Sequence, residues 1–213
     1  MKTAIVGAGG FGREVLALLN NINTVNYTFN VAGFIDDNLE VGTSIGGLTI
    51  LGSVNQINKM NLDAVVVAIG NSKVRKEVVN RLPEDIKTPT VIHPSVLIEN
   101  SDTISIGKGC IICAGNIITT DVSIGDFCIL NLASTIGHDA KMGDFVSVMP
   151  GVNISGGAKI EYGVYIGTGA KLIKATTVGK NSIVGAGAVV DTYVEPNTTV
   201  VGVPARPIKS RNG

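Results

Sequence analysis

Residues 124–142 read IGDFCILNLASTIGHDAKM, and within this stretch a large aliphatic residue returns at every sixth position. An α-helix has about 3.6 residues per turn and cannot produce a period of six. A fixed short period in a glycine-rich chain is instead typical of a β-solenoid, in which coils of parallel strands stack on one another. The period continues without a break over fifteen positions, namely Ile106, Ile112, Ile118, Ile124, Leu130, Ile136, Met142, Val148, Ile154, Ile160, Ile166, Leu172, Val178, Val184 and Val190.

Two other positions of this six-residue unit are also restricted. The residue after the aliphatic one is often glycine, at positions 107, 125, 137, 143, 167, 179 and 185. The fifth position is nearly always small or β-branched, as in Cys110, Val122, Cys128, Ser134, Ala140, Val146, Val152, Ala158, Ala170, Ser182 and Ala188. Hydrophobic residues form 45% of the chain but aromatic residues only 4%, which suits a repetitive core of narrow cross-section.

The first part of the chain follows a different pattern. A β-rich run, residues 3–6, leads into the glycine cluster of residues 7–12 and then into a helical pattern with an apolar face at Val15, Leu16, Leu18 and Leu19. Further strands are predicted at residues 30–35 and 64–69, and a second helix near residues 73–82. The continuous apolar run of residues 64–69 is typical of a strand buried on both faces of a parallel sheet. We therefore predict an α/β domain of Rossmann type at residues 1–88 and an all-β solenoid domain at residues 89–213.

Bulk properties exclude several classes of partner. Seventeen basic and seventeen acidic residues give a net charge of zero, so no general attraction to nucleic acid or anionic lipid is expected. No apolar run approaches the roughly 20 residues that span a bilayer, and the first residues show no signal-peptide pattern. Three cysteines do not suggest a disulfide framework. We expect a cytoplasmic protein that binds neither nucleic acid nor membrane.

The two patterns together resemble a known family. The hexapeptide repeat resembles that of the acyltransferases built on a left-handed parallel β-helix, in which three hexads make one coil of eighteen residues. The glycine cluster, the sequence FIDD at residues 34–37, the sequence AIGN at residues 68–71 followed by Arg75, and HPS at residues 93–95 resemble the sugar acetyltransferases of the NeuD/PglD type. That resemblance implies a nucleotide-sugar-binding Rossmann domain joined to a left-handed β-helix.

The chain has only two histidines, and one of them, His138, stands beside Asp139 within the repeat. With eighteen residues per coil, His138 stacks with Thr120 on one side and with Gly156, Lys174 and Thr192 on the other, at about 4.8 Å per coil. On spacing alone, a surface histidine satisfied by a neighbouring coil explains this position as well as a catalytic one does.

Chemistry favours the catalytic interpretation. Acetyl transfer from a thioester needs a base near pH 7, which an imidazole supplies, and a donor for the oxyanion, for which the Gly156 N–H is the obvious candidate. An acid such as Asp139 would orient the imidazole, but it can reach His138 only where the backbone turns. The family motif, an Asn followed by His and an acid, is matched by Asn131, His138 and Asp139.

The resemblance also implies sites for both substrates. The amides of Gly9, Gly10, Phe11 and Gly12 would lie near phosphate or sugar, with Asp36 and Asp37 at base or ribose and Gly70 in the same nucleotide-sugar site. The spacing from Gly12 to Asp36 leaves an NAD site open, although the α/β segment is short for one. Donor-binding positions of relatives correspond to Ser147, Thr168, Ala186 and Pro204, and Ser147 replaces a histidine, so its contact is expected to be weaker or absent. Pro150, Thr168, Ala186 and Pro204 are predicted to form one column, and residues 201–207 to cap the open end of the β-helix.

Metal chemistry has little support in the sequence. Cys110 and Cys113 have CxxC spacing, but Cys110 and Cys128 are eighteen residues apart at the small fifth position, which favours stacking in the core. No second CxxC completes a zinc site. A γ-class carbonic anhydrase, another β-helix enzyme, needs three histidines, and this chain has two. We expect no metal.

The function implied by the resemblance is N-acetylation of a nucleotide-linked amino sugar, with acetyl-CoA as co-substrate, His138 as the base and Gly156 as the oxyanion donor. Two alternatives remain open at this point: O-acetylation of a sugar such as sialic acid, and a non-catalytic solenoid whose Rossmann domain senses a nucleotide. The family also implies a homotrimer, because a single β-helix would give the coenzyme channel only one wall.

Overall fold

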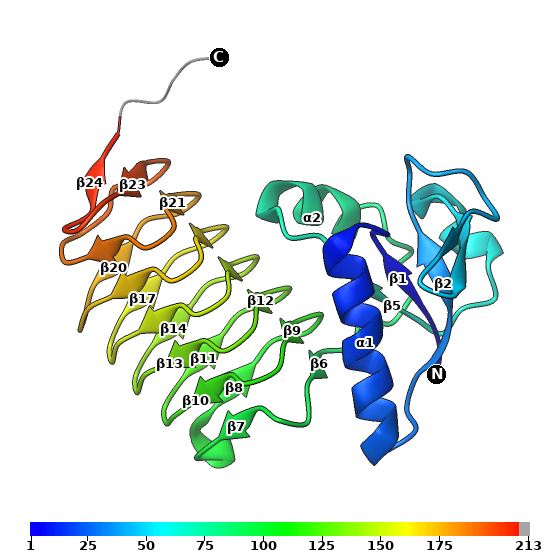
Figure 1. Cartoon of the computed structure of the whole chain (residues 1–213), viewed down its shortest axis with the longest axis horizontal. Helices are drawn as coiled ribbons and strands as arrows, with labels where there is room; N and C mark the ends of the chain where they lie inside the picture. Colours follow the sequence, from blue (N-terminus) through cyan, green and yellow to red (C-terminus); the bar gives the residue numbers. More distant parts are fainter. Residues whose placement is uncertain (209–213) are drawn as a thin grey trace. The chain divides into compact units, whose positions relative to one another are not determined.

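The chain folds into two compact units. The computed structural model describes residues 1–208, so the last five residues of the predicted second domain lie outside it. One unit comprises Met1–Pro94 and the other begins at Ser95 (Figure 1). The observed division falls within the His93-Pro94-Ser95 segment, a few residues after the predicted boundary. Among the described residues, no helix is long and apolar enough to cross a membrane.

The first unit is built on a five-stranded sheet with the order β3-β4-β2-β1-β5. Its parallel strands are β1 (Lys2–Val6), β2 (Asn30–Ile35), β4 (Leu48–Gly52) and β5 (Ala64–Val67), and β3 (Ser44–Ile45) pairs antiparallel with β4. The helical elements are α1 (Gly10–Val25), the 3-10 helix η1 (Val54–Lys59) and α2 (Ser72–Val79). The predicted strand–glycine turn–helix unit and both further strands are confirmed, although β5 is two residues shorter than the apolar run that predicted it.

Helix α1 buries the predicted apolar face against this sheet. Val15, Leu18 and Leu19 are buried, Leu16 is half-buried, and the helix begins at Gly10, within the glycine cluster. Gly12 has to be glycine because an added Cβ would collide with the carbonyl oxygen of Gly7. Helix α2 begins at a different kind of cap, since the side chain of Asn71 accepts hydrogen bonds from two N–H groups of its first turn.

The β3–β4 hairpin was not predicted. Its two-residue turn is Gly46-Gly47, and both residues have positive φ angles of 58° and 83°. A Gly-Gly pair between two short apolar runs is a recognised hairpin signal. The sequence therefore contained the necessary information for this hairpin.

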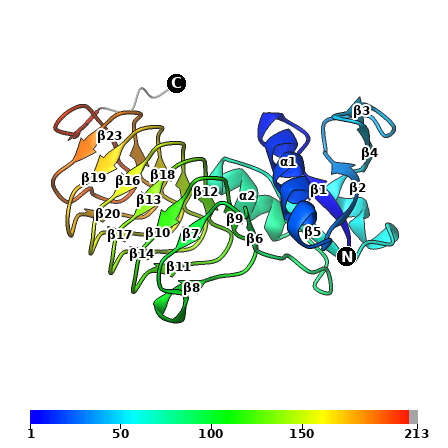
Figure 2. The same cartoon turned by 60° about the horizontal axis from the view of Figure 1, so that its bottom comes forward.

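The second unit is a parallel β-helix whose coils stack in sequence order (Figures 1 and 2). A short strand, β6 (Val91–Ile92), precedes it within the first unit. The β-helix opens with β7 (Leu97–Ile98) and the 3-10 turn η2 (Ser101–Thr103), and it closes with β23 (Thr199–Val201) and β24 (Arg206–Pro207). Between these lie β8 (Ser105–Ile106), β9 (Ile111–Ile112), β10 (Ile117–Ile118), β11 (Ser123–Ile124), β12 (Ile129–Leu130), β13 (Thr135–Ile136), β14 (Lys141–Met142), β15 (Ser147–Val148), β16 (Asn153–Ile154), β17 (Lys159–Ile160), β18 (Tyr165–Ile166), β19 (Lys171–Leu172), β20 (Thr177–Val178), β21 (Ile183–Val184) and β22 (Val189–Val190).

Every one of these fifteen strands ends at an aliphatic residue of the predicted series, which confirms the hexad period. The strands form three parallel sheets, which we call faces. Face 1 is β7-β10-β13-β16-β19-β22, face 2 is β8-β11-β14-β17-β20, and face 3 contains β9-β12-β15-β18-β21-β23. Register pairs such as Ile136 with Ile154 confirm eighteen residues per coil.

Each hexad also contains one residue that turns the chain from one face to the next. From Gly109 to Gly187 every sixth residue has a positive φ angle. Seven of these fourteen residues are glycine. The other seven are Asp121, Phe127, Ala133, Asp139, Phe145, Ala175 and Asn181. The turn position is therefore fixed by the coil geometry, and the chain accepts left-handed strain there even without glycine.

The eighteen-residue register fails at both ends of the β-helix. Ile98 pairs with Ile118, twenty residues on, because η2 adds two residues to that corner. Val178 bridges Val194 and Val184 pairs with Val200, a separation of sixteen. The connection after β22 is thus two residues short, and the prediction that Pro204 stacks on Ala186 is wrong. The rest of that column holds, since the Gly169 N–H bonds to Pro150 and the Gly187 N–H to Thr168.

The interior of the β-helix is lined as predicted. Aliphatic residues at the hexad positions are buried, and Cys110 and Cys128 lie buried one above the other with Cys113 nearby in sequence. Asn116 occupies a fifth position where a small residue was expected. Its side-chain NH₂ group donates to the carbonyls of Cys113, Leu130 and Asn131, which satisfies the nitrogen, while the buried Oδ1 has no partner among the described residues.

An ion pair braces the first unit beside its sheet. Arg81, which follows α2, bonds to Asp37 at 2.8 Å and to Asn55 of η1, and the other oxygen of Asp37 accepts the Val54 N–H. Partial burial raises the pKa of Asp37, but the hydrogen bonds from Val54 and Arg81 and the charge of Arg81 outweigh it and hold that pKa below its ordinary value. The brace ties the end of β2 to η1 and to the end of α2.

The strand β10 offers a matched pair that tests the core. Ile118 is fully buried and its neighbour Ile117 is 36% exposed. We expect Ile118→Ala to lower the free energy of unfolding by about 2–5 kcal/mol, because it leaves a cavity in the core. Ile117→Ala should cost less than about 1 kcal/mol. Urea unfolding followed by circular dichroism measures both, and equal losses would contradict the inside–outside assignment.

The Asp37 brace makes stability depend on pH. Because the pKa of Asp37 is lowered in the folded chain, its stabilisation is present above the unfolded value of about 3.9 and is lost as the pH falls through the folded pKa. Asp37→Asn should therefore cost about 0.5 kcal/mol at pH 7, given that both partners are about one-third exposed. The difference from wild type should shrink in acid. Asp85→Asn is the control, and a pH-independent difference at Asp37 would contradict this account.

Candidate active site

His138 and Asp139 lie at a corner of the β-helix, between β13 on face 1 and β14 on face 2. The imidazole Nδ1 lies 2.7 Å from Asp139 Oδ2, and both side chains are more than half exposed. This contact depends on the turn position, because Asp139 has a φ of 59°. On a straight strand the two side chains would point to opposite faces. The turn therefore builds the pair.

The bond to Asp139 indicates which imidazole nitrogen is open to accept a proton. An ionised carboxylate only accepts hydrogen bonds, so in the neutral imidazole Nδ1 carries the proton and Nε2 carries the lone pair. A Cβ added to Gly156 would collide first with Nε2 of His138 and next with Cε1 and Cδ2. The unprotonated nitrogen is thus the one that lies against Gly156, on the next coil.

The backbone N–H of Gly156 is the second group of interest at this contact. The Gly157 N–H donates to the carbonyl of His138, and the carbonyl of Gly156 accepts from Ala175, so these backbone groups belong to the ladder between coils. The N–H of Gly156 has no acceptor within residues 1–208. The residue that packs against the imidazole thus carries a backbone N–H without an acceptor in the described part of the chain. This arrangement can take a proton from a nucleophile and donate a hydrogen bond to a developing oxyanion.

The remaining predicted residues of the β-helix lie elsewhere. Asn131 follows β12 at the corner between faces 3 and 1, and its buried side chain accepts the Leu132 N–H. Thr168 and Ala186 lie exposed along the same corner. Ser147 is buried on β15 of face 3. Face 1 therefore separates these residues from His138 within one chain, and their roles toward a donor stay predictions.

In the first unit, the predicted nucleotide-sugar residues gather at the carboxyl ends of the parallel strands. The chain runs from β1 through β2 to β4 on one side and then places β5 on the other side of β1. Ligands of open α/β sheets bind where the strand order reverses in this way. The loops after β1 and β5 meet there, since a Cβ on Gly7 would touch the carbonyl of Ala68.

Several glycines at this edge of the sheet have open space beside their Cα atoms. An added Cβ would meet no atom within 4 Å at Gly9 or Gly70 and only the tip of Arg13 at Gly10. Gly12, by contrast, is buried against Gly7 and serves the packing of α1. Phe11 is half-buried on the first turn of α1. Open glycines at a helix N-terminus suit the close approach of a phosphate-bearing ligand.

The two neighbouring aspartates are not equivalent. Asp36 accepts hydrogen bonds from the N–H groups of Ala8 and Asn38, so it lies directly beside the glycine loop. Asp37 is committed to Val54 and Arg81. Each oxygen of Asp36 retains a lone pair for a ribose hydroxyl, whereas the contact predicted for Asp37 has to compete with an existing ion pair.

One contributor that the sequence patterns did not single out as a site residue is Arg75. It is buried on α2, and its guanidinium donates to the carbonyls of Ile69 and Gly70 at 2.6 and 3.1 Å. It therefore fixes the loop after β5 that includes Gly70. The sequence signal for Arg75 was its position four residues after Asn71, the N-cap of α2. A side chain at that helix position points back toward the strand before the helix.

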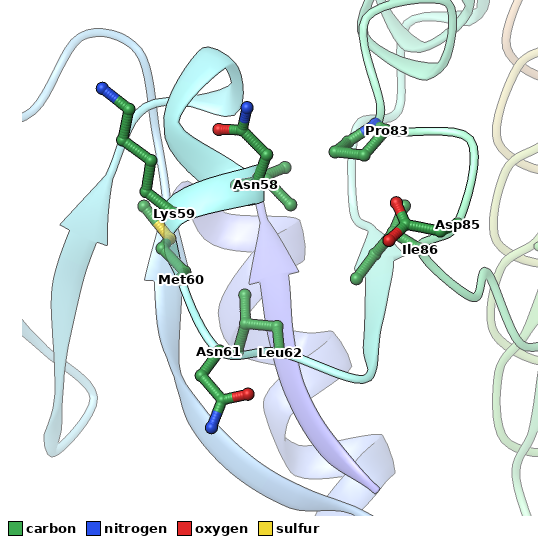
Figure 3. A pocket seen from close by; sticks show the side chains of 9 residues that line it. Asn58, Lys59, Met60, Asn61, Leu62, Pro83, Asp85 and Ile86 are labelled. Atoms are coloured by element: carbon green, nitrogen blue, oxygen red, sulfur yellow. The ribbon is translucent and has the colours of Figure 1, made fainter.

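The first unit also has a hollow of about 370 Å³, whose walls are Asn58–Leu62 on one side and Pro83, Asp85 and Ile86 on the other (Figure 3). These residues precede β5 or follow α2, so the hollow lies at the amino end of β5, away from the glycine loop. Within the described residues, no three His, Cys, Asp or Glu side chains lie close enough to hold a metal ion.

Comparison with known proteins adds independent evidence. The PglD N-terminal domain family matches residues 2–82. The GDP-perosamine N-acetyltransferase of Escherichia coli O157:H7 is 32% identical and is aligned over 96% of this chain and 95% of its own length. The structure of WeeI from Acinetobacter baumannii AYE is 36% identical, with a TM-score of 0.88 over 98% of this chain and all of that one.

A third relative was solved with ligands. PerB from Caulobacter crescentus, in complex with CoA and GDP-perosamine, is 26% identical, with a TM-score of 0.86 over 98% of this chain and 97% of that one. These similarities cover both units together, and they bear out the predicted fold class of a Rossmann-like domain followed by a left-handed β-helix. The chain therefore belongs to the NeuD/PglD-type sugar acyltransferases, the hexapeptide-repeat acetyltransferases with an N-terminal PglD domain.

Proposed function

We propose that this protein transfers an acetyl group from acetyl-CoA to the amino group of a nucleotide-linked amino sugar. The observation that carries the proposal is the placement of His138 Nε2 against Gly156 while Nδ1 is bonded to Asp139. The E. coli relative is a GDP-perosamine N-acetyltransferase, and the Caulobacter relative binds CoA and GDP-perosamine. These relatives support an amino group as the acceptor and a coenzyme A thioester as the donor.

The proposed mechanism is direct attack. The neutral amine adds to the thioester carbonyl while Nε2 of His138 takes its proton. Asp139 holds the imidazole in the required tautomer and stabilises the imidazolium that forms. The N–H of Gly156 donates to the oxygen that becomes negative. The C–S bond then breaks, and the imidazolium returns its proton to the leaving sulfur, which gives free coenzyme A.

We assign the nucleotide portion of the acceptor to the carboxyl ends of the parallel strands in the first unit. Gly9 and Gly10, beside Phe11 at the start of α1, and Gly70 after β5 have open space next to their Cα atoms. Asp36 is the better candidate for a ribose or base contact because Asp37 is engaged by Arg81. The active form we propose is a homotrimer. Thr168 and Ala186 lie on a different corner from His138, and a neighbouring chain would bring such a corner to it; light scattering should give three chain masses.

We also propose that the reaction takes place in the cytoplasm. The three cysteines are free and buried, as is usual for proteins of a reducing compartment.

The function is tested with acetyl-CoA and a panel of GDP-, UDP- and dTDP-linked amino sugars. Release of free thiol, with NMR identification of an acetamide in the product, is the expected result. An acetate ester formed on a sugar hydroxyl would identify an O-acetyltransferase instead. Binding of a nucleotide sugar, seen as a raised thermal midpoint, without any thiol release would indicate a non-catalytic sensor.

His138→Ala should reduce kcat by about 10²–10⁴-fold, the usual effect of losing a positioned base. The side chain is more than half exposed, so the thermal midpoint should hardly change. Asp139→Asn should cost less, because it weakens the orientation of the base without removing it. A His138→Ala enzyme with near-wild-type turnover would show that the histidine is structural.

Gly156→Ala tests the contact between coils. The new methyl group would occupy the position of the imidazole edge, so either His138 or the thioester has to move. We expect turnover to fall by about 10²–10³-fold, the size of a lost oxyanion donor. Ser155→Ala, at the exposed neighbouring position, is the control and should be close to wild type. Full activity in Gly156→Ala would place the thioester elsewhere.

A further inference from the structure

Charged side chains are sorted by sign along the corner that carries His138. We call this corner, over the coil of His138 and the two coils on each side of it, the catalytic edge; it comprises residues 97–106, 117–124, 135–142, 153–160 and 171–178. The coil after these carries an acid, Asp191, which is paired with Arg206. The two coils before His138 contribute only acids, Glu99, Asp102 and Asp121. The two coils after it contribute only lysines, Lys159, Lys171 and Lys174. All six are exposed, and the coil of His138 lies between the two groups.

Asp121 is the acid nearest to the reacting groups. It holds the turn position one coil before Asp139, and the Asp139 N–H donates to the carbonyl of Thr120 at 3.1 Å, so the two corners are in direct contact. Asp121 is fixed in place, because its N–H donates to Thr103 Oγ1 and its Oδ2 accepts from Thr120 Oγ1. Its Oδ1 has no partner within the described residues. A fixed carboxylate oxygen is thus available about 5 Å along the edge from the catalytic pair.

Lys174 has the corresponding place on the other side. The Ala175 N–H donates to the carbonyl of Gly156 at 2.9 Å, so Lys174 lies one coil beyond the proposed oxyanion donor. That is two coils, or about 10 Å, from His138 along the axis. Lys171 is held by Asn153 Oδ1 and the carbonyl of Gly169. The ammonium group of Lys174 has no ion pair or hydrogen bond in residues 1–208.

The two proposed substrates carry opposite charges, and each charge is complementary to one side of the catalytic edge. An aliphatic amine is largely protonated near pH 7 and arrives as a cation. A coenzyme A thioester is neutral at its reacting end and carries phosphates at the far end of a long flexible arm. Charges within about 8–10 Å of a site act before salt screens them. The acidic side therefore suits the ammonium group, and the basic side suits the phosphates of the donor.

We propose that Asp121 and Lys174 sort the two substrates to opposite sides of His138. Asp121 receives the ammonium group of the acceptor, and Lys174 receives a phosphate group of the donor. This inference rests on the proposed function and adds two specificity-determining residues to it. It also accounts for product release, since acetylation converts the cation into a neutral amide that Asp121 no longer attracts.

The proton balance is complete without a further reactant. The ammonium group held by Asp121 loses one proton to solvent and becomes the neutral amine. His138 accepts the second proton as the C–N bond forms and returns it to sulfur as the C–S bond breaks. The net products are the amide, the coenzyme A thiol and one proton.

The test compares four single variants with wild type in a crossed design. Asp121→Asn and Lys174→Gln remove the two charges. Asp126→Asn controls for a corner aspartate that bonds to a neighbouring coil, and Lys180→Gln for an exposed lysine on another corner. The readouts are KM for each substrate, Kd for acetyl-CoA by calorimetry, and Ki for the N-acetylated product. Acetyl-3′-dephospho-CoA is a second donor.

Asp121→Asn should raise KM for the amino sugar roughly tenfold and leave KM for acetyl-CoA and Ki for the neutral product unchanged. Lys174→Gln should raise Kd and KM for acetyl-CoA roughly tenfold and leave KM for the amino sugar unchanged. If the Lys174 effect disappears with acetyl-3′-dephospho-CoA, the lysine reads the 3′-phosphate; if it persists, the lysine reads the pyrophosphate.

Several results would overturn the proposal. One is an unchanged KM in both variants, and another is an exchange of the two effects. A third is a parallel rise in the Ki of the neutral product, which a merely structural role of Asp121 would produce. A wild-type enzyme that acetylates no amino sugar would refute the proposed function and the Asp121 assignment with it. The Lys174 assignment would still be decided by acetyl-CoA binding.

Discussion

The backbone ladder between coils is the constraint on which the rest of this structure depends. Each strand from β7 to β22 is only two residues long, so none of them is stable by itself, and each coil is held by N–H to carbonyl bonds to its neighbours. That ladder sets the register at eighteen residues, and the register decides which side chains meet. Gly156 lies against His138 because eighteen residues separate them, and a left-handed turn position at Asp139 returns its carboxylate to the imidazole. The geometry of the proposed catalytic groups is thus a consequence of the repeat.

The same constraint explains which parts of the fold could be predicted from the sequence. A period of six, read over Ile106 to Val190, placed all fifteen of those strands, because every hexad has to supply one aliphatic residue to a narrow core. The ends of the β-helix were not predictable from the period. The register is twenty residues at Ile98 because of η2, and sixteen residues at Val200 because the connection after β22 is short. The second irregularity is the reason why the predicted stacking of Pro204 on Ala186 is wrong. The sequence period predicts the regular coils of the β-helix, but it does not predict how the chain caps the two ends.

The candidate site was predicted unevenly for a related reason. The stacking of Gly156 on His138 follows from coil arithmetic, and the roles of His138, Asp139 and Gly156 follow from the acyl-transfer chemistry that the resemblance implies. Asn131 and Thr168 came only from the resemblance, and they lie on another corner of the chain. In the first unit, two adjacent aspartates looked alike in sequence but differ in structure. Asp36 accepts a hydrogen bond from the glycine loop, whereas Asp37 is paired with an arginine 44 residues later in the sequence. Such long-range partners leave no local pattern in a single sequence.

In the proposed reaction the thioester is attacked at the contact between His138 and Gly156. The most direct measurement is a crystal structure of the His138→Ala variant with acetyl-CoA and the nucleotide-linked amino sugar bound, so that turnover is blocked. We expect the thioester oxygen within hydrogen-bonding distance of the Gly156 N–H, with the acceptor amine toward Asp121 and the phosphates of the donor toward Lys174. A thioester bound more than one coil away from Gly156 would rule out this site of attack.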